Sequence, residues 1–481
     1  MIEIQLTNTL SGEKTPVVAD ANGRVGMYVC GPTVYDRAHI GNARPVVVFD
    51  LLFRLLRHVY GEQRITYVRN FTDVDDKIIK RADETGRPIG DITTETSAWY
   101  LEDMAALGAL EPNIMPRATA FVSAPEQPTD MIRLIETLID KGHAYAAEGH
   151  VLFSVKSWEP YGSLAHRSLD EMMAGARVEV APYKRDAMDF VLWKPSTPEQ
   201  PGWESPWGRG RPGWHIECSA MVKATLGDRI QIHGGGIDLA FPHHENERAQ
   251  SCCANGTDEM ADIWVHNGYL MVEGEKMSKS LGNFFTVKDL RDRGIPGLVI
   301  RYLLLSTHYR QPIDWTEKRV EEATRVINRW RRALDHAEGK GTPPEEAVAA
   351  LADDLNSWTA LRAIDAEAKR VLEPRDEAEA REASAAFLGG LALMGFEGLE
   401  SASHVEEAAK GAIGDDQTAR IEALLAARVA ARKSKDFALA DGIRDGLSAA
   451  GVVVKDGPEG TAWELGPAFD PAKLTDLESL R

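Results

Sequence analysis

The sequence predicts an α/β protein: a doubly wound parallel-sheet domain with an insertion, then an α-helical domain and a small mixed C-terminal module. Two strand–helix–strand patterns predict the sheet, one over residues 25–71 and one over residues 229–266. Such units join parallel strands, and a pair of them is typical of a nucleotide-binding fold. Helical periodicity over residues 315–394 predicts the helical domain that follows.

The first unit opens with an apolar, β-leaning run at residues 25–29, which Gly31-Pro32 ends. Apolar residues then recur at helical spacing over residues 46–56. We expect Asn42 to cap this helix and Pro45 to lie in its first turn.

His39 and Gly41 therefore lie between the end of a strand and the N-terminus of a helix. Free backbone N–H groups and the helix dipole favour phosphate at such a place. A lone histidine there is also an ordinary loop residue, so this position needs support from elsewhere in the chain.

Composition shifts and turn-rich stretches predict the domain boundaries. An insertion follows the first unit, with a helix at residues 131–139, a strand at 151–155 and a turn-rich stretch at 194–212. The last residues predict two helices and a hairpin. The expected domains are residues 1–119 and 213–314 (two catalytic halves), 120–212 (insertion), 315–400 (helical domain), 401–416 (linker) and 417–481 (C-terminal module).

Charge and cysteine content restrict the function. The formal net charge of −19 over 481 residues argues against non-specific nucleic-acid binding, so an RNA contact would need a local basic patch. Four cysteines in so long a chain favour a reducing, cytoplasmic setting. The chain has no signal-peptide pattern at its start, and no run approaches the roughly 20 apolar residues of a membrane span.

A metal site is one of two interpretations of four scattered residues. His243 and Glu247 are four apart and share one helix face, Cys30 ends the first strand, and Cys218 lies in a later segment. These are zinc-ligand types, but paired Cys-x-x-Cys motifs are absent from the sequence. Their pattern equally fits two buried small hydrophobic residues and a helix start. Asp73, Asp75 and Asp76 also leave a metal open, although we expect them to charge a helix start.

Two distant segments carry a family resemblance. His39-Ile40-Gly41-Asn42 and Lys276-Met277-Ser278-Lys279-Ser280 together resemble the signature pair of class I aminoacyl-tRNA synthetases. The usual last residue of the first motif is histidine, and Asn42 keeps a hydrogen-bond donor but no charge. Within the class, the chain most resembles the cysteinyl-tRNA synthetases over essentially its whole length. Residues 72–80 match a segment of that family closely.

The resemblance implies an enzyme that activates L-cysteine with ATP and transfers it to tRNA(Cys). It implies one Zn²⁺ per chain on Cys30, Cys218, His243 and Glu247, and Mg²⁺ accompanying ATP. Zinc would favour a substrate thiol over a hydroxyl, which a shape-based pocket separates poorly. The resemblance further implies catalytic His39, Asn42, Lys276 and Lys279, and nucleotide binding by Gly41, Gly236, Asp238 and Lys279. We expect a cytoplasmic monomer without a membrane partner.

The expected RNA-binding surface lies in the last domain. Arg428, Arg432 and Lys435 follow helical spacing and would form one cationic face, and Trp463 would stack on an anticodon base. This region resembles the family's anticodon module, although Glu464 stands where the family often has a basic residue.

Two alternatives remain. A ligase that joins cysteine to an amino-sugar in thiol-cofactor synthesis would share the catalytic domain and zinc site but would not need residues 411–481. A catalytically silent RNA-binding paralogue would not need the intact motifs. Cysteine-dependent pyrophosphate exchange separates an enzyme from a binding protein.

Overall fold

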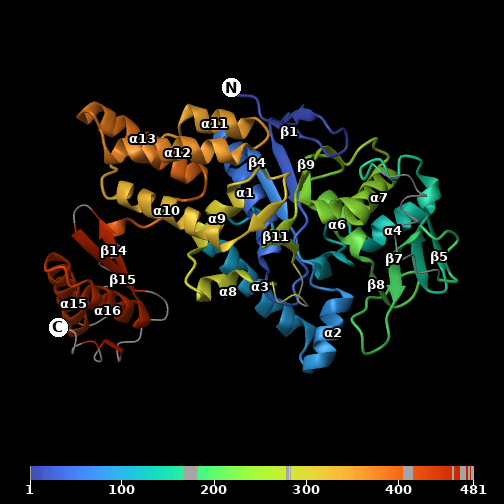
Figure 1. The fold of residues 1–481 in the computed structure, drawn as a ribbon. Helices are drawn as coiled ribbons and strands as arrows, with labels where there is room; N and C mark the ends of the chain where they lie inside the picture. The colour runs from blue at the N-terminus through green and yellow to red at the C-terminus, as the bar shows by residue number, and fades with distance from the viewer. Residues whose placement is uncertain are drawn as a thin grey trace.

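The computed structural model describes residues 2–166, 181–277, 281, 283–404, 415–457, 460–465, 473, 474 and 477 (Figure 1). At its centre is a parallel sheet of four strands in the order β10-β9-β3-β4. The strands are β3 (Val25–Val29), β4 (Ile65–Arg69), β9 (Ile230–Gly236) and β10 (Ala261–Asn267). Both predicted strand–helix–strand units are confirmed, and they join at the β3–β9 pair.

Both faces of this sheet are buried, as parallel sheets require. Met27 and Val29 of β3 face one hydrophobic core together with helix α1 (Ile40–Tyr60), whereas Tyr28 between them faces a second core. That second core contains α4 (Met131–Asp140), α6 (Trp214–Thr225) and α7 (Glu245–Asn255). The sheet is therefore held between two packed layers.

The start of α1 differs from the sequence-based expectation. The helix begins at Ile40 with His39 as its N-cap residue, so Asn42 is inside the first turn and Pro45 lies beyond it. The expected capping by Asn42 is wrong. A tertiary contact sets the boundary: the backbone of residues 38–40 pairs with residues 285–287, and the Ile40 N–H donates to Phe285 O at 3.0 Å.

The insertion forms an antiparallel sheet in the order β5-β6-β7-β8. Its strands are β5 (Ala144–Ala147), β6 (His150–Phe153), β7 (Phe190–Pro195) and β8 (Gly210–Pro212). The predicted helix α4 and strand β6 are present. The stretch expected to be turn-rich contains β8 and the end of β7, because Trp193 and Lys194 pair with Pro212 and Arg211 across the sheet.

Shorter elements connect these parts. They are β1 (Gln5–Thr7), β2 (Lys14–Pro16), α2 (Asp76–Thr85), α3 (Ile89–Ala106), β11 (Leu270–Val272), β12 (Glu275–Lys276), α8 (Val287–Asp292), α9 (Gly297–Leu305) and β13 (Ile313–Trp315). Single turns of 3₁₀ helix occur at Glu62–Arg64, Ala118–Phe121, Val155–Ser157 and Ile237–Leu239, and a π-helical turn at Ala240–His244 precedes α7.

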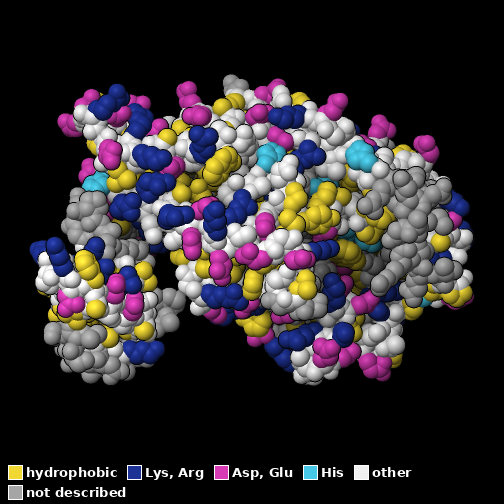
Figure 2. All heavy atoms as spheres, in the orientation of Figure 1, with side chains coloured by type: hydrophobic (Ala, Val, Ile, Leu, Met, Phe, Trp, Pro, Cys, Tyr) yellow, Lys and Arg dark blue, Asp and Glu magenta, His cyan; other side chains and the backbone are white. Residues whose placement is uncertain are grey.

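The predicted helical domain consists of α10 (Glu317–Leu334), α11 (Glu345–Ala352), α12 (Ser357–Leu372) and α13 (Glu377–Leu393). Helix α11 begins directly after Pro344, its N-cap residue. On the surface, Figure 2 shows lysine and arginine side chains gathered over α10. Lys318, Arg325 and Arg332 of α10 are exposed and recur every seventh residue, so they share one face.

The C-terminal module has the two helices and the hairpin that the sequence predicted: α15 (Asp415–Lys433), α16 (Phe437–Ala449), β14 (Val452–Gly457) and β15 (Gly460–Leu465). Two expected RNA contacts in it are wrong. Arg428 is 6% exposed and Trp463 is 5% exposed, because a core this small uses the tryptophan as one of its largest members. Among the described residues of this module, the exposed cations are Arg432, Lys433, Lys435, Arg444 and Lys473.

Among the described residues, none of the helices is long and apolar enough to cross a membrane.

Candidate functional site

A cavity of about 570 Å³ opens at the carboxyl ends of β3, β9 and β10. This edge is where ligands bind in open parallel sheets. Its lining brings together the segment after β3, the start of α1, the end of β9 and the segment around β11 and β12. The predicted site residues on its wall are Cys30, His39, Gly41, Asn42, Gly236, Asp238 and Lys276.

The two signature segments meet at Gly41. A Cβ atom on Gly41 would lie 2.9 Å from the His39 ring and 3.3 Å from Met277 Cε, so a side chain there would force the segments apart. Lys276 ends β12 with its ammonium nitrogen 5.9 Å from the centre of the Tyr269 ring. Lys279 lies outside the described residues.

The three glycines at the end of β9 allow close packing, and one of them lines the cavity. A Cβ on Gly234 would lie 2.2 Å from Phe49 Cζ of α1, so this glycine lets α1 approach the sheet. A Cβ on Gly236 would lie 2.4 Å from Asp238 Oδ1. Asp238 therefore folds back over Gly236 at the cavity wall.

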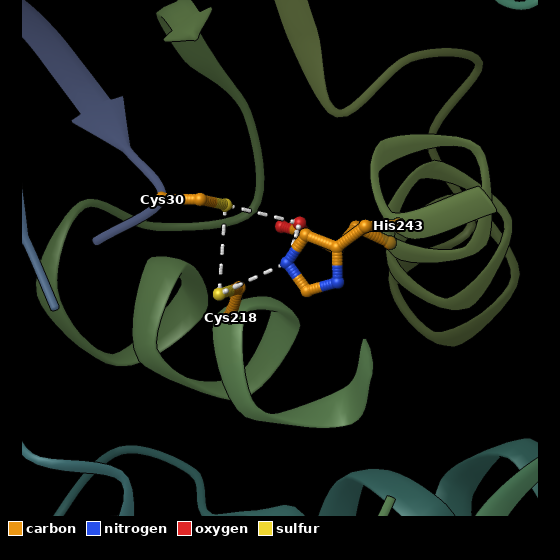
Figure 3. Close-up of side chains that lie close together, drawn as sticks. Cys30, Cys218 and His243 are labelled. Atoms are coloured by element: carbon orange, nitrogen blue, oxygen red, sulfur yellow. Dashed lines mark hydrogen bonds and ion pairs between the residues drawn. The ribbon is translucent and has the colours of Figure 1, made fainter. Parts of the chain in front are cut away.

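Four buried or half-buried donors converge beside the cavity, as Figure 3 shows for Cys30, Cys218 and His243. Cys30 follows β3, Cys218 lies on α6, and His243 in the π-helical turn stands four residues before Glu247 on α7. The Cys30 and Cys218 sulfurs are 3.6 Å apart without a disulfide, and Cys218 Sγ is 3.6 Å from His243 Nε2. Glu247 Oε1 lies 2.9 Å from His243 Nε2 and 3.2 Å from Cys30 Sγ.

These separations fit a tetrahedral metal site. Zinc with its usual bond lengths would place two sulfurs about 3.8 Å apart, sulfur and nitrogen about 3.6 Å apart, and nitrogen and oxygen about 3.4 Å apart. Glu247 Oε2 is buried and makes no hydrogen bond within the described part of the chain, although it lies 3.3 Å from His233 Nε2. The quartet therefore has the donor types, the spacing and a spare carboxylate oxygen for a metal ion.

The electrostatics of the quartet agree with this. Burial raises the pKa of Cys218, but the Cys30 thiol and His243 outweigh it and lower that pKa to about 6. A thiolate is the form that binds metal. Burial alone would lower the pKa of His243, whereas the neighbouring Glu247 carboxylate raises it to about 10. The carboxylate and imidazole thus hold a proton between them that a metal ion would displace.

A second group of donors shares two members of the quartet. Cys30, His233, His244 and Glu247 also lie within 4.8 Å of one another. This group has a single sulfur, so the group with two thiols suits zinc better. Sequence analysis passed over His233. It gave no distinct signal, because His233 follows Gln231 in the polar positions that alternate with Ile230 and Ile232, yet in the structure it is buried.

A tryptophan, Trp214, reaches the site. The Trp214 ring lies 4.2 Å from the His243 ring in a stacked arrangement, is 39% exposed and lines the cavity. Trp203 and Trp207 instead pack against the second hydrophobic core.

The acidic segment after β4 is structural, as expected. Asp75 caps α2 by accepting from the Lys77 N–H at 2.8 Å, and Asp73 accepts from the backbone and hydroxyl of Thr119. Asp76 pairs with Lys194 and Arg211 of the insertion. These contacts join α2 to the insertion.

Comparison with known proteins agrees with this site. The family model described as the tRNA synthetases class I (C) catalytic domain matches residues 16–325, and that of the cysteinyl-tRNA ligase anticodon binding domain matches residues 414–463. The cysteine–tRNA ligase of Ruegeria pomeroyi is 56% identical over 494 residues, covering 100% of both chains. That of Roseobacter denitrificans is 54% identical over 492 residues, covering 99% of this chain and 100% of the relative.

One solved structure shows the same fold. The LeuRS–tRNA–LeuAMS ternary complex of Agrobacterium radiobacter K84 superposes with a TM-score of 0.53 at 13% identity, over 78% of this chain and 83% of that one.

The sheet, the two signature segments and the family models together define a class I tRNA synthetase. The match to the anticodon-binding family model and the near-complete coverage of the relatives narrow the assignment within this class. The chain belongs to the cysteine–tRNA ligase family. The same match argues against the amino-sugar ligase alternative, which would not need that tail.

Proposed function

We propose that this protein is a cysteine–tRNA ligase that makes cysteinyl-adenylate from L-cysteine and ATP and then charges tRNA(Cys). The observation that carries this proposal is the position of the Cys30–Cys218–His243–Glu247 quartet. Its member Cys30 lines the same cavity that both signature segments line, and so does Trp214, which stacks on His243. A site for sulfur thus stands next to a site for a nucleotide.

The quartet would hold one Zn²⁺ per chain, because its two sulfurs, one imidazole and one carboxylate suit that ion. When bound, zinc would ligate the substrate thiol and favour its deprotonation, whereas a serine hydroxyl is a poorer ligand. Selectivity would come from this chemistry, since thiol and hydroxyl differ too little in shape for a pocket to separate. Trp214, stacked on His243, covers the quartet on the cavity side.

In the first step, a carboxylate oxygen of cysteine forms a bond to the α-phosphorus of ATP. The bond from that phosphorus to the bridging oxygen breaks, and pyrophosphate leaves with the electron pair. His39 and Asn42, at the start of α1, would contact the phosphates, where the helix dipole favours negative charge. Lys276 and Lys279 would neutralise charge on the departing pyrophosphate.

The remaining contacts position the nucleotide. Gly41 and Gly236 give the backbone close access to it, and Asp238 would accept hydrogen bonds from the ribose hydroxyls. Mg²⁺ would accompany ATP, held mainly by its phosphates. In the second step, the terminal adenosine hydroxyl of tRNA attacks the activated carbonyl, AMP leaves, and the hydroxyl proton is released.

The C-terminal module would bind the anticodon end of tRNA(Cys) through exposed residues. Arg432, Lys433 and Lys435 lie at and beyond the end of α15, beside the 62%-exposed Phe437. Cations and an exposed aromatic ring together suit phosphate and an unstacked base. The four free cysteines support a reducing, cytoplasmic setting, and we expect the protein to act as a monomer.

The test is a pair of assays on the full chain. We expect ATP–pyrophosphate exchange that depends on cysteine and is not supported by serine, together with charging of tRNA(Cys). Charging should weaken steeply as salt rises, because phosphate contacts release counterions. Exchange without charging, together with ligation of cysteine to an amino-sugar, would replace the proposal with the alternative ligase. Absence of exchange would remove the enzyme assignment.

A further inference from the structure

A buried carboxylate on α3, Asp103, lies between the two signature segments. Its side chain is 0% exposed. Arg37 Nη1 donates to both of its oxygens, at 3.2 and 3.3 Å, and Arg291 Nη1 lies 3.8 Å from Oδ1. Arg37 precedes His39 and lines the cavity, whereas Arg291 lies on α8, beyond the lysine segment. One carboxylate therefore contacts both an arginine of the cavity wall and an arginine of α8.

The backbone brings the same two segments into register. The Val287 N–H donates to Ala38 O at 3.2 Å, and the Ile40 N–H donates to Phe285 O at 3.0 Å. Helix α8 starts at once after this bridge, with Thr286 and Asp289 forming a capping box. A shift of α8 would therefore move the residues that flank His39.

The neighbouring Glu102 offers a natural comparison. It lies 3.9 Å from Arg37 Nη2 and 3.7 Å from Arg291 Nη1, so it faces the same two arginines. Its side chain is 59% exposed, and water screens an ion pair of this kind. Asp103 is shielded from water, so its attraction for the arginines is screened less, although burial also raises the pKa of its carboxyl group against the lowering effect of Arg37 and Arg291. Only the buried member of this acidic pair can fix the geometry.

We propose that Asp103 is a positioning residue for adenylate formation, which holds Arg37 and Arg291 together and so fixes the His39 segment against the lysine segment. This rests on the proposed function, because the two segments act on one substrate only if the cavity binds ATP. Asp103 touches no reacting atom; it acts through the two arginines. Displacing a reacting group by about 1 Å lowers a rate about 10²-fold, so this arrangement has a measurable effect on the reaction.

The first test compares Asp103→Asn with Glu102→Gln in the full chain. Each replacement keeps the size of its side chain and removes one negative charge. We expect Asp103→Asn to slow single-turnover adenylate formation about 10–100-fold, while the dissociation constant for cysteine changes by less than about twofold. Glu102→Gln should retain the wild-type rate within about twofold. A rate for Asp103→Asn equal to that of Glu102→Gln would overturn the proposal.

The second test uses Arg37→Met, Arg291→Met and the double variant, and remains decisive if Asp103→Asn folds poorly. Residues that act through one shared partner give non-additive effects. We therefore expect the double variant to be no more than about threefold slower than the slower single variant. Effects that multiply would show that the arginines act independently and would overturn the proposal. Failure of the wild-type chain to exchange pyrophosphate would instead overturn the proposed function.

Discussion

Replacing Cys218 with serine should remove the metal from the site. Cys218 is 1% exposed and contributes two of the quartet's measured edges, 3.6 Å to Cys30 Sγ and 3.6 Å to His243 Nε2. A hydroxyl oxygen at this place stands farther back than the sulfur, because the bond from carbon to oxygen is shorter. It is also not ionised near neutral pH. The position would therefore lose both the charge and the reach of the ligand.

The size of the effect follows from sharing the binding energy among the ligands. Protein zinc sites of this kind bind with about 10–16 kcal/mol at pH 7, which divided among four ligands gives about 2.5–4 kcal/mol for each. We expect Cys218→Ser to weaken metal binding about 10²–10³-fold, since each 1.4 kcal/mol is a factor of ten. Cysteine-dependent exchange should fall with the metal content.

The assay is metal content measured by elemental analysis after dialysis against chelators of graded affinity. Cys252→Ser is the matched control. Cys252 is also buried, at 3% exposed, but its sulfur contacts Asp258 O and lies outside the quartet. The wild type and Cys252→Ser should each keep about one zinc per chain. Equal retention by Cys218→Ser, or equal loss by Cys252→Ser, would refute the ligand assignment.

Three further outcomes are expected. Lys279→Ala should slow adenylate formation about 10²–10³-fold with cysteine binding unchanged, and Lys288→Ala on α8 should not, as pre-steady-state exchange would show. Asp50→Asn should reduce the free energy of unfolding in urea by about 3–5 kcal/mol, because buried Arg301 and Arg54 lose their shared carboxylate. Exposed Asp353→Asn should change it by less than about 1 kcal/mol. Lys318, Arg325 and Arg332 form one exposed cationic face of α10, which suits phosphate. Replacing all three with glutamine should therefore weaken tRNA binding and lower the salt dependence of its affinity by about one unit of slope per lost phosphate contact. The exposed Arg381→Gln on α13 should leave both unchanged.

The sequence by itself determined the sheet and most of its helices. Apolar runs at residues 25–29 and 263–266 were long enough to define β3 and β10, and helical periodicity over residues 315–394 predicted the helical domain that follows, but not the bounds of its helices. These patterns are local, because each residue's burial repeats with the period of its own element. His243 and Glu247 lie on one helix face, as their i, i+4 spacing predicted, although His243 belongs to a π-helical turn. His243 Nε2 is 2.9 Å from Glu247 Oε1.

Tertiary structure decided what local pattern could not. Because residues 38–40 pair with residues 285–287, α1 starts at Ile40, before Asn42, although Asn42 has the better capping side chain. A small core buried Trp463 and Arg428, which their spacing alone had assigned to an RNA-binding face.

The metal quartet shows the same division. The sequence supplied its four residue types, but Cys30 and Cys218 are 188 residues apart and meet only because β3 and α6 border the same hydrophobic core. Asp103 carried no sequence signal at all. Its place between Arg37 and Arg291 depends on how α3 and α8 pack around the cavity, and burial there gives an ordinary carboxylate its strength.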